Sequence, residues 1–195
     1  MTHIAKYIIP LFKDPGTFLE IGAWDGEHIS QTVELERIGW HGVCVDPFAR
    51  NFNNRSCYVV RSAISKDGKP REFIKVSIDR RDGGDVSYFS GFADTLKDHW
   101  FLIEKYCDYE IVMIPTIKFS DLPVQPHINF LSVDTEGSEL EIFQSIDFSR
   151  YSFDVIMFEH NGIDKGVGRL LRDNGYRLHE SLEIDDIYVN EKFVV

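Results

Sequence analysis

Long apolar runs are missing from this sequence of 195 residues, which also contains only three cysteines. No stretch approaches the ~20 apolar residues that a membrane span requires, so we expect none. The first residues lack a basic region followed by an apolar run and a small-residue cleavage site, so we expect no secretory leader. Cys44, Cys57 and Cys107 are odd in number and lack metal-ligand spacing, which indicates reduced thiols and a cytoplasmic location.

Basic residues are scarce relative to acidic ones. Lysine and arginine number 21 against 32 aspartates and glutamates, which gives a net charge of -11. Because neutralising phosphates requires clustered basic side chains, this balance excludes a general nucleic-acid binder. The rest of the composition, 43% hydrophobic and 27% charged, is typical of one globular domain over residues 1–195.

Short apolar runs alternate with amphipathic stretches along most of the chain. Near-continuous apolar strands separated by helices indicate an α/β fold, with a parallel sheet covered on both faces. The last two runs alternate in polarity, as the strands of a terminal hairpin do. Strands are predicted at 17–22, 42–47, 57–65, 71–78, 128–137, 153–161, 176–183 and 184–190, and helices at 27–38 and 138–146.

The segment at about 80–120 interrupts this alternation. It is polar and dotted with glycine at its start, and we predict an insertion over the carboxyl edge of the sheet. A short helix is expected within 93–107 and an extended piece at 110–119. Its aromatic side chains can form either a wall of a binding site or a small core of their own; they include Tyr88, Phe89, Phe92 and Trp100.

Ligands of such sheets bind outside the carboxyl ends of the strands. The first strand runs into the turn of "FLEIGAWDG", residues 18–26. A dinucleotide fingerprint requires glycine at the third position from Gly22, where this chain has Trp24. Glu20 and Asp25 would also repel a diphosphate. An NAD-dependent oxidoreductase is therefore the weaker alternative.

A cofactor with a cationic end suits this turn better. S-adenosylmethionine carries an ammonium and a sulfonium, so Glu20 and Asp25 become attractive partners. Asp46 ends the second strand, where a carboxylate can accept the hydrogen bonds of ribose hydroxyls. The alternative for Glu20 and Asp25 is that they satisfy free amides at a helix start. The predicted cofactor-binding residues are Glu20, Gly22, Ala23, Asp25, Gly26, Asp46, Pro47, Phe48, Ser62 and Ala63.

A second acidic cluster follows in "INFLSVDTEGSELEIF", residues 128–143. Carboxylates in the first turn of a helix are common as caps, which is the reading favoured for Glu139 and Glu141. Asp134 differs, because it ends a buried strand beside the predicted methyl-donor site.

These motifs, together with "GVCVDP" and "SAISKDG", resemble the FkbM family of S-adenosylmethionine-dependent methyltransferases over roughly residues 17–161. The resemblance implies a class I methyltransferase Rossmann-like fold, with a mostly parallel seven-stranded sheet, helices on both faces and a reversed C-terminal hairpin. It also implies O-methylation of a sugar or another small natural-product-like acceptor. Two positions depart from the family pattern: Ser132, where lysine is frequent, and Asp46, where glutamate is frequent.

Transfer of a methyl group to a hydroxyl requires alignment of the acceptor oxygen and removal of its proton. Candidates for the base are Asp134, Glu136 and His160. Alternatively, Asp134 with Glu159, His160 or Asn161 can hold a divalent ion, Mg²⁺ or Mn²⁺, that stabilises an alkoxide. A catalytically inactive cofactor-binding module is the other class of function that these motifs allow.

Overall fold

The computed structural model describes residues 4–96, 99–162 and 165–194. Its main sheet consists of β1 (Thr17–Ile21), β2 (His41–Val45), β3 (Tyr58–Val60), β9 (His127–Val133), β10 (Ser152–Glu159), β11 (Tyr176–Ser181) and β12 (Asp185–Asn190). The strand order is β11-β12-β10-β9-β1-β2-β3. All neighbours from β10 to β3 are parallel, whereas β12 is antiparallel to both β10 and β11. This confirms the predicted class I methyltransferase fold with its reversed C-terminal hairpin.

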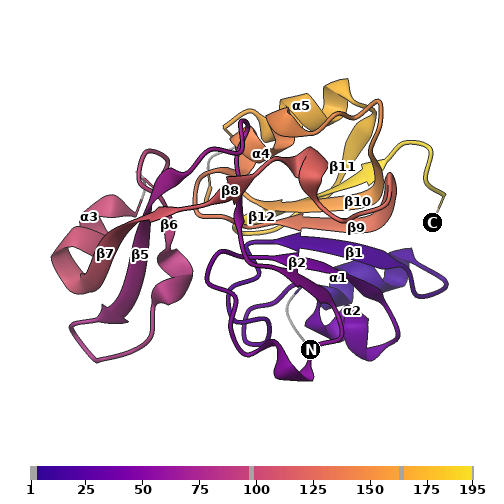
Figure 1. The fold of residues 1–195 in the computed structure, drawn as a ribbon. Helices are drawn as coiled ribbons and strands as arrows, with labels where there is room; N and C mark the ends of the chain where they lie inside the picture. The colour runs from indigo at the N-terminus through magenta and orange to yellow at the C-terminus, as the bar shows by residue number, and fades with distance from the viewer. Residues whose placement is uncertain (1–3, 97–98, 163–164, 195) are drawn as a thin grey trace.

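Helices cover both faces of this sheet (Figure 1). The four helices on it are α1 (Ala5–Ile8), α2 (Val33–Arg37), α4 (Glu139–Ser145) and α5 (Val167–Asp173). Phe143 of α4 packs with Ile156 of β10 on one face, and Leu35 of α2 packs with Phe130 of β9 on the other. Successive strand residues point to opposite faces, so the central strands are apolar at nearly every position.

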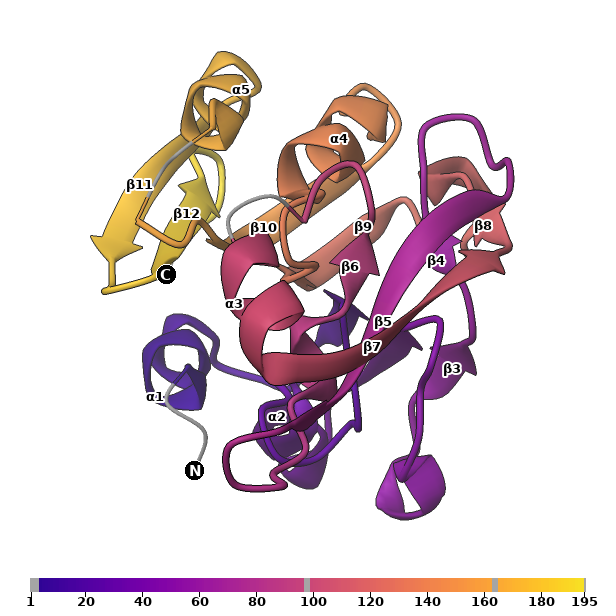
Figure 2. The same cartoon turned by 90° about the vertical axis from the view of Figure 1, so that its left-hand side faces the viewer.

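A three-stranded sheet of order β6-β5-β7 lies across the carboxyl ends of the main sheet (Figure 2). We call the segment from residue 71 to residue 114 the inserted unit. It starts at β5, earlier than the predicted boundary near residue 80. Its elements are β5 (Arg71–Asp79), β6 (Gly91–Phe92), α3 (Trp100–Tyr106) and β7 (Cys107–Ile114), and the short pair β4 (Ala63–Ile64) with β8 (Thr116–Ile117) connects it to the main sheet.

Arg71 fastens the inserted unit to the main domain. Its guanidinium lies 2.8 Å from a carboxylate oxygen of Glu141 in α4 and 2.7 Å from one of Asp94. The guanidinium carbon also lies 4.1 Å from the ring centroid of Phe92. One side chain thus joins β5 to α4 and to the loop after β6.

Two predicted elements differ from the observed ones. The predicted helix at 27–38 is reduced to α2, because Asp25 accepts the amides of Glu27 and His28 in a turn that precedes the helix. The predicted strand at 57–65 is divided into β3 and β4. Short 3₁₀ turns complete the fold: η1 (Ile9–Leu11), η2 (Phe52–Asn54), η3 (Ser87–Phe89) and η4 (Phe119–Asp121).

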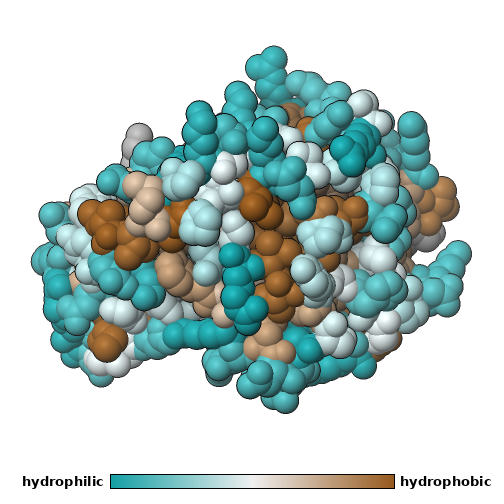
Figure 3. Space-filling model, viewed as in Figure 1, coloured by the Kyte–Doolittle hydropathy of each residue, from teal (hydrophilic) through white to brown (hydrophobic). Residues whose placement is uncertain are grey.

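The helices, the cysteines and the surface add three observations. In the described ranges, no helix has the length and apolar character needed to cross a membrane. Cys44, Cys57 and Cys107 are all free thiols, as predicted. Apolar side chains are exposed on the inserted unit (Figure 3). In β7, Ile111 and Met113 are exposed.

Candidate active site

A cavity of about 270 Å³ opens where the carboxyl ends of β1, β2 and β9 meet the inserted unit. This position outside the strand ends is where ligands of open α/β sheets bind. Two distant parts of the sequence form the walls of the cavity. The main domain contributes eight of the predicted site residues: Gly22, Asp46, Pro47, Phe48, Ser62, Ala63, Asp134 and Glu136. The inserted unit contributes Phe73, Lys75, Ser87, Tyr88, Ser90 and Phe92.

Gly22 sits at the floor of this cavity, directly after β1. Its φ of +89° lies in the left-handed region, which glycine adopts without strain. A Cβ atom added there would come 1.5 Å from the carbonyl oxygen of Asp134. The amide of Gly22 donates to the carbonyl of Val45 at 2.9 Å. Glycine therefore lets the ends of β1, β2 and β9 converge.

Asp46 presents a fixed carboxylate to the cavity. One of its oxygens accepts the amide of Trp24 at 2.9 Å and the other accepts the amide of Phe48 at 2.7 Å. Burial raises the pKa of Asp46 to about 6, against the lowering effect of these two amides. Each oxygen keeps acceptor capacity. The arrangement fits two hydroxyl donors on one ribose.

An aromatic wall stands beside Asp46. The rings of Phe48 and Phe73 lie 5.6 Å apart, and the Lys75 ammonium lies 5.1 Å from the centroid of Phe48. Phe73 and Lys75 were not among the predicted site residues. The alternation of "REFIKVSI" places them on one face of β5, so a reading of that face could have found them.

Trp24 and Arg50 join the first turn to the inserted unit. The indole nitrogen of Trp24 donates to the Ser87 hydroxyl at 2.8 Å, and Arg50 donates to the same hydroxyl at 2.8 Å. Arg50 also pairs with Asp85 at 2.5 Å. Trp24, which takes the place of the third-position glycine, thus fixes the inserted unit over the cavity. No local motif signals this contact.

Glu20 does not line the cavity. Its carboxylate accepts the Ser30 hydroxyl at 2.9 Å, the Gln31 amide at 2.6 Å and the Thr32 hydroxyl at 2.5 Å. Burial raises the pKa of Glu20, while these hydrogen bonds and the nearby Arg55 guanidinium lower it. These contacts direct the Glu20 carboxylate to the turn before α2, as the alternative reading expects, and its contact with a cofactor ammonium stays a prediction.

Asp25 likewise binds backbone amides of the turn, those of Glu27 and His28. Although burial raises its pKa, hydrogen bonds from Glu27 and His28 hold the pKa below the usual value. Ala23 is buried in the core on the α2 side of the sheet. A Cβ atom at Gly26 would meet the ring of Phe52 at 2.6 Å. Ala23, Asp25 and Gly26 therefore shape the turn, whereas Gly22 and Trp24 of the same turn line the cavity.

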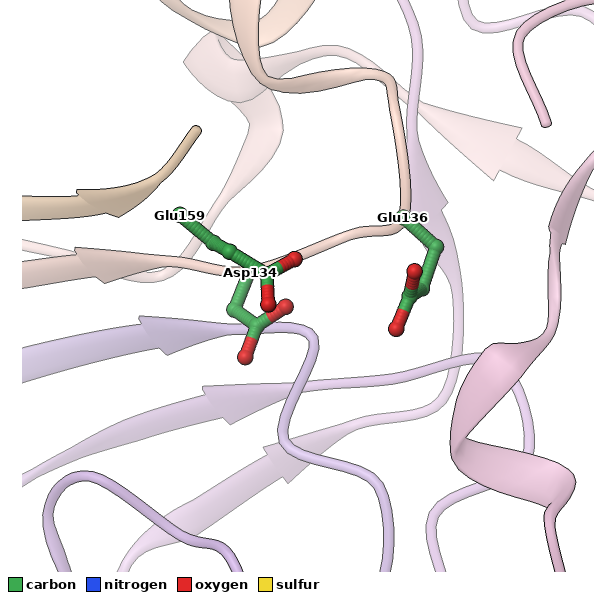
Figure 4. A group of neighbouring side chains, drawn as sticks. All are labelled: Asp134, Glu136 and Glu159. Carbon is green, nitrogen blue, oxygen red and sulfur yellow. The ribbon is translucent and has the colours of Figure 1, made fainter. Parts of the chain in front are cut away.

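Three carboxylates meet at the ends of β9 and β10 (Figure 4). Asp134, Glu136 and Glu159 each offer one oxygen, and these oxygens lie within 4.8 Å of one another. Burial, followed by the charges of its neighbours, raises the pKa of Asp134 and of Glu136 well above the usual range. Burial raises the pKa of Glu159 to about 7. We call these three residues the carboxylate cluster.

His160 contacts Asp186 and Gly162. Its Nε2 is 3.6 Å from a carboxylate oxygen of Asp186 in β12, and its Nδ1 accepts the amide of Gly162 at 2.9 Å. Asp134 is hydrogen-bonded to Glu159, one of the partners expected for it in holding an ion, and the role of His160 as a base stays a prediction. His160 and Glu136 both line a second cavity, of about 20 Å³.

The aromatic candidates divide between the two predicted roles. Tyr88 and Phe92 line the large cavity. Phe89 and Trp100 pack against a small core in the inserted unit that contains Val76. Phe89 and Trp100 thus follow the small-core reading, and a binding role for Tyr88 and Phe92 stays a prediction.

Left-handed backbone at non-glycine residues also gathers here. Trp24, Glu136 and Asn161 have φ of 42°, 57° and 49°, and each follows one of the strands β1, β9 and β10. Such a conformation costs ~1–3 kcal/mol and concentrates at functional sites. The strain supports the assignment of these strand ends to the site.

Sequence comparison decides the family. The profile of the methyltransferase FkbM domain matches residues 20–178. The chain belongs to the FkbM methyltransferase family. Comparison with curated proteins finds no match. Its fold is similar to a precorrin-6y C5,15-methyltransferase from Geobacter metallireducens, with a TM-score of 0.49 and 13% identity over 95% of this chain and 87% of that one. It is also similar to a SAM dependent methyltransferase from Aquifex aeolicus, with a TM-score of 0.43 and 12% identity over 96% and 89%.

Membership of the FkbM family makes S-adenosylmethionine the expected methyl donor, and the residues of the large cavity fit it. The Asp46 carboxylate suits a ribose, and Phe48, Ala63 and Phe73 offer apolar surface for an adenine. The matched range includes Asp46 and the carboxylate cluster, so the site lies within the FkbM domain.

Proposed function

We propose that this FkbM-family protein methylates a hydroxyl oxygen of a sugar or another small polyhydroxylated acceptor. The observation that carries the proposal is the position of Glu136, which lines both the large cavity and the small polar one. An acceptor in contact with the second cavity reaches the carboxylate cluster through Glu136 and Glu159, whereas Asp46 lines only the large cavity.

The polarity of the second cavity supports a polyhydroxylated acceptor. Its lining includes His99, Glu136, Glu159, His160 and Asn161, all with hydrogen-bonding side chains. Carboxylates and imidazoles match hydroxyl groups, which are both donors and acceptors. An entirely apolar acceptor would leave these groups unpaired at a cost of about 1–3 kcal/mol each.

The reaction requires an acceptor oxygen in line with the methyl group and a destination for its proton. When bound, S-adenosylmethionine supplies an electrophilic methyl carbon whose sulfur departs as a neutral thioether. Asp134 and Glu136 accept the hydrogen bond of the acceptor hydroxyl, and one of these carboxylates takes its proton as the carbon–oxygen bond forms. Alignment by such fixed groups can contribute ~7–11 kcal/mol to lowering the barrier.

The inserted unit covers the site and excludes water. Tyr88, Ser90 and Phe92 line the large cavity from above the strand ends.

The free thiols and the net negative charge agree with the predicted cytoplasmic location, which we retain as part of this proposal.

A screen of acceptors tests the proposal. The protein is incubated with S-adenosylmethionine labelled in the methyl group and with a panel of mono- and disaccharides, polyols, phenols and amines. We expect label in a hydroxylated acceptor, with an O-methyl linkage in the product. Transfer only to amines would exclude O-methylation. Cofactor binding without transfer to any member of the panel would favour an inactive cofactor-binding module.

A further inference from the structure

We propose that Asp134, Glu136 and Glu159 bind one hard divalent cation, Mg²⁺ or Mn²⁺, at the ends of β9 and β10. The three side chains converge from two neighbouring strand ends (Figure 4). Their ligand oxygens lie within 4.8 Å of one another. Three ionised carboxylates this close repel one another strongly in a site removed from water, so a bound cation stabilises the arrangement.

Two buried polar atoms, one in the cluster and one facing it, make no hydrogen bond. They are Glu136 Oε2 and His99 Nε2, which lie 3.4 Å apart. The Glu136 side chain is only 11% exposed. Within residues 4–96, 99–162 and 165–194, the only other such atom is Ser132 Oγ. The two atoms face each other as an ion pair without a hydrogen bond, so a ligand that reaches Glu136 Oε2 would supply the hydrogen-bonding or coordinating partner that this buried oxygen lacks.

The space at this position suits a single ion. The cavity of about 20 Å³ is lined by Glu136, Glu159, His99 and His160, whereas Asp134 lines the large cavity that Glu136 also borders. A cavity of this size accommodates roughly one water-sized particle. Carboxylate oxygens are the ligands that Mg²⁺ and Mn²⁺ prefer, and three of them leave coordination positions for water or an acceptor oxygen. His99 Nε2 faces the same space and can pair with the ion or its water.

Each carboxylate offers the cation one oxygen, so the second oxygen of Asp134 or Glu136 stays available to take the acceptor proton. The cation lies on the acceptor side of Glu136, where its charge stabilises a developing alkoxide on the acceptor oxygen. Metal binding itself does not depend on the proposed acceptor. It can therefore be tested without methyl transfer.

Electron paramagnetic resonance of Mn²⁺ measures binding directly, since the signal of free Mn²⁺ falls when the ion is bound. We expect one bound Mn²⁺ per chain, displaced by Mg²⁺. Asp134→Asn and Glu136→Gln should each weaken binding by at least the roughly tenfold that loss of even an outer-shell partner costs. Glu141→Gln is the matched control, because Glu141 pairs with Arg71 at 2.8 Å outside the cluster. It should bind Mn²⁺ as the unmodified chain does.

Thermal denaturation shows whether a variant that loses Mn²⁺ binding is still folded. The unmodified protein should melt at a higher temperature with Mg²⁺ than with a chelator. Glu136→Gln removes one charge from the cluster, so it should be at least as stable without metal and should lose the response to Mg²⁺. Failure to bind Mn²⁺ at millimolar concentration, or equal binding by Glu136→Gln, would overturn the proposal. Methyl transfer that persists with chelator would then leave the proposed O-methylation standing.

Discussion

A Cβ atom on Gly22 would lie 1.5 Å from the carbonyl oxygen of Asp134, so the ends of β1 and β9 are in direct backbone contact. This contact places the first turn, which carries Trp24, beside the start of the carboxylate cluster. The cofactor cavity and the acceptor side of the site therefore share one floor.

Gly22→Ala should lower the free energy of unfolding by about 3 kcal/mol or more. The substitution adds left-handed strain and forces a backbone shift at Asp134. Gly175→Ala is the control, because Gly175 has a similar φ of +84° and no atom within 4 Å of an added Cβ. It should lose only about 1–2 kcal/mol. Chemical denaturation measures both, and equal losses would contradict the close approach.

Glu20→Gln should destabilise the fold and leave the cofactor affinity nearly unchanged. Glu20 is buried and accepts hydrogen bonds from Ser30, Gln31 and Thr32, so the loss should be about 1–3 kcal/mol. Denaturation and calorimetry with S-adenosylhomocysteine separate the two effects. Weaker cofactor binding at unchanged stability would restore Glu20 to the cofactor site.

Cofactor affinity should fall as the pH drops below about 6, because burial raises the pKa of Asp46 to about 6. The ionised carboxylate accepts ribose hydrogen bonds, and protonation removes that capacity. At one pH unit below this pKa, affinity for S-adenosylhomocysteine should be about tenfold weaker than at neutral pH. Asp46→Asn should bind more weakly by about 1.5–3 kcal/mol at neutral pH and lack this pH dependence. A titration that is identical in the two proteins would remove Asp46 from the cofactor site.

S-adenosylhomocysteine should slow amide hydrogen exchange in residues 85–92, which contain Ser87, Tyr88 and Ser90 of the cavity wall. Without ligand, this loop should exchange faster than the buried strand β9. β7 is the internal control, because it lies in the same inserted unit but does not line the cavity. Equal protection of β7 and residues 85–92 by the ligand would show a general stabilisation and contradict a covering role.

Strand periodicity predicted the sheet and its site edge well. Asp46 and Asp134 each follow a buried strand, and parallel strands bring such ends together whatever lies between them. The direction of a side chain in a turn is set by tertiary contacts. Glu20 and Asp25 read as cofactor ligands, yet Thr32 and His28 bind their carboxylates away from the cavity.

The remaining differences arise in the inserted unit. The contact of Trp24 with Ser87 joins residues far apart in the sequence, so no local pattern reveals it. The contact of His99 with Glu136 was also not predicted, because only the fold brings the His99 ring nitrogen to 3.4 Å from the Glu136 carboxylate. Sequence patterns therefore placed Asp46, Asp134 and Glu136 at the cavity, and the structure supplied their partners.

Calorimetric titration with S-adenosylhomocysteine and with NAD tests the central claim, that the large cavity is the cofactor site of an FkbM methyltransferase. We expect one molecule of S-adenosylhomocysteine to bind per chain, with affinity reduced in Asp46→Asn, and NAD to bind far more weakly. Tighter binding of NAD, or binding of S-adenosylhomocysteine that Asp46→Asn leaves unchanged, would contradict the account.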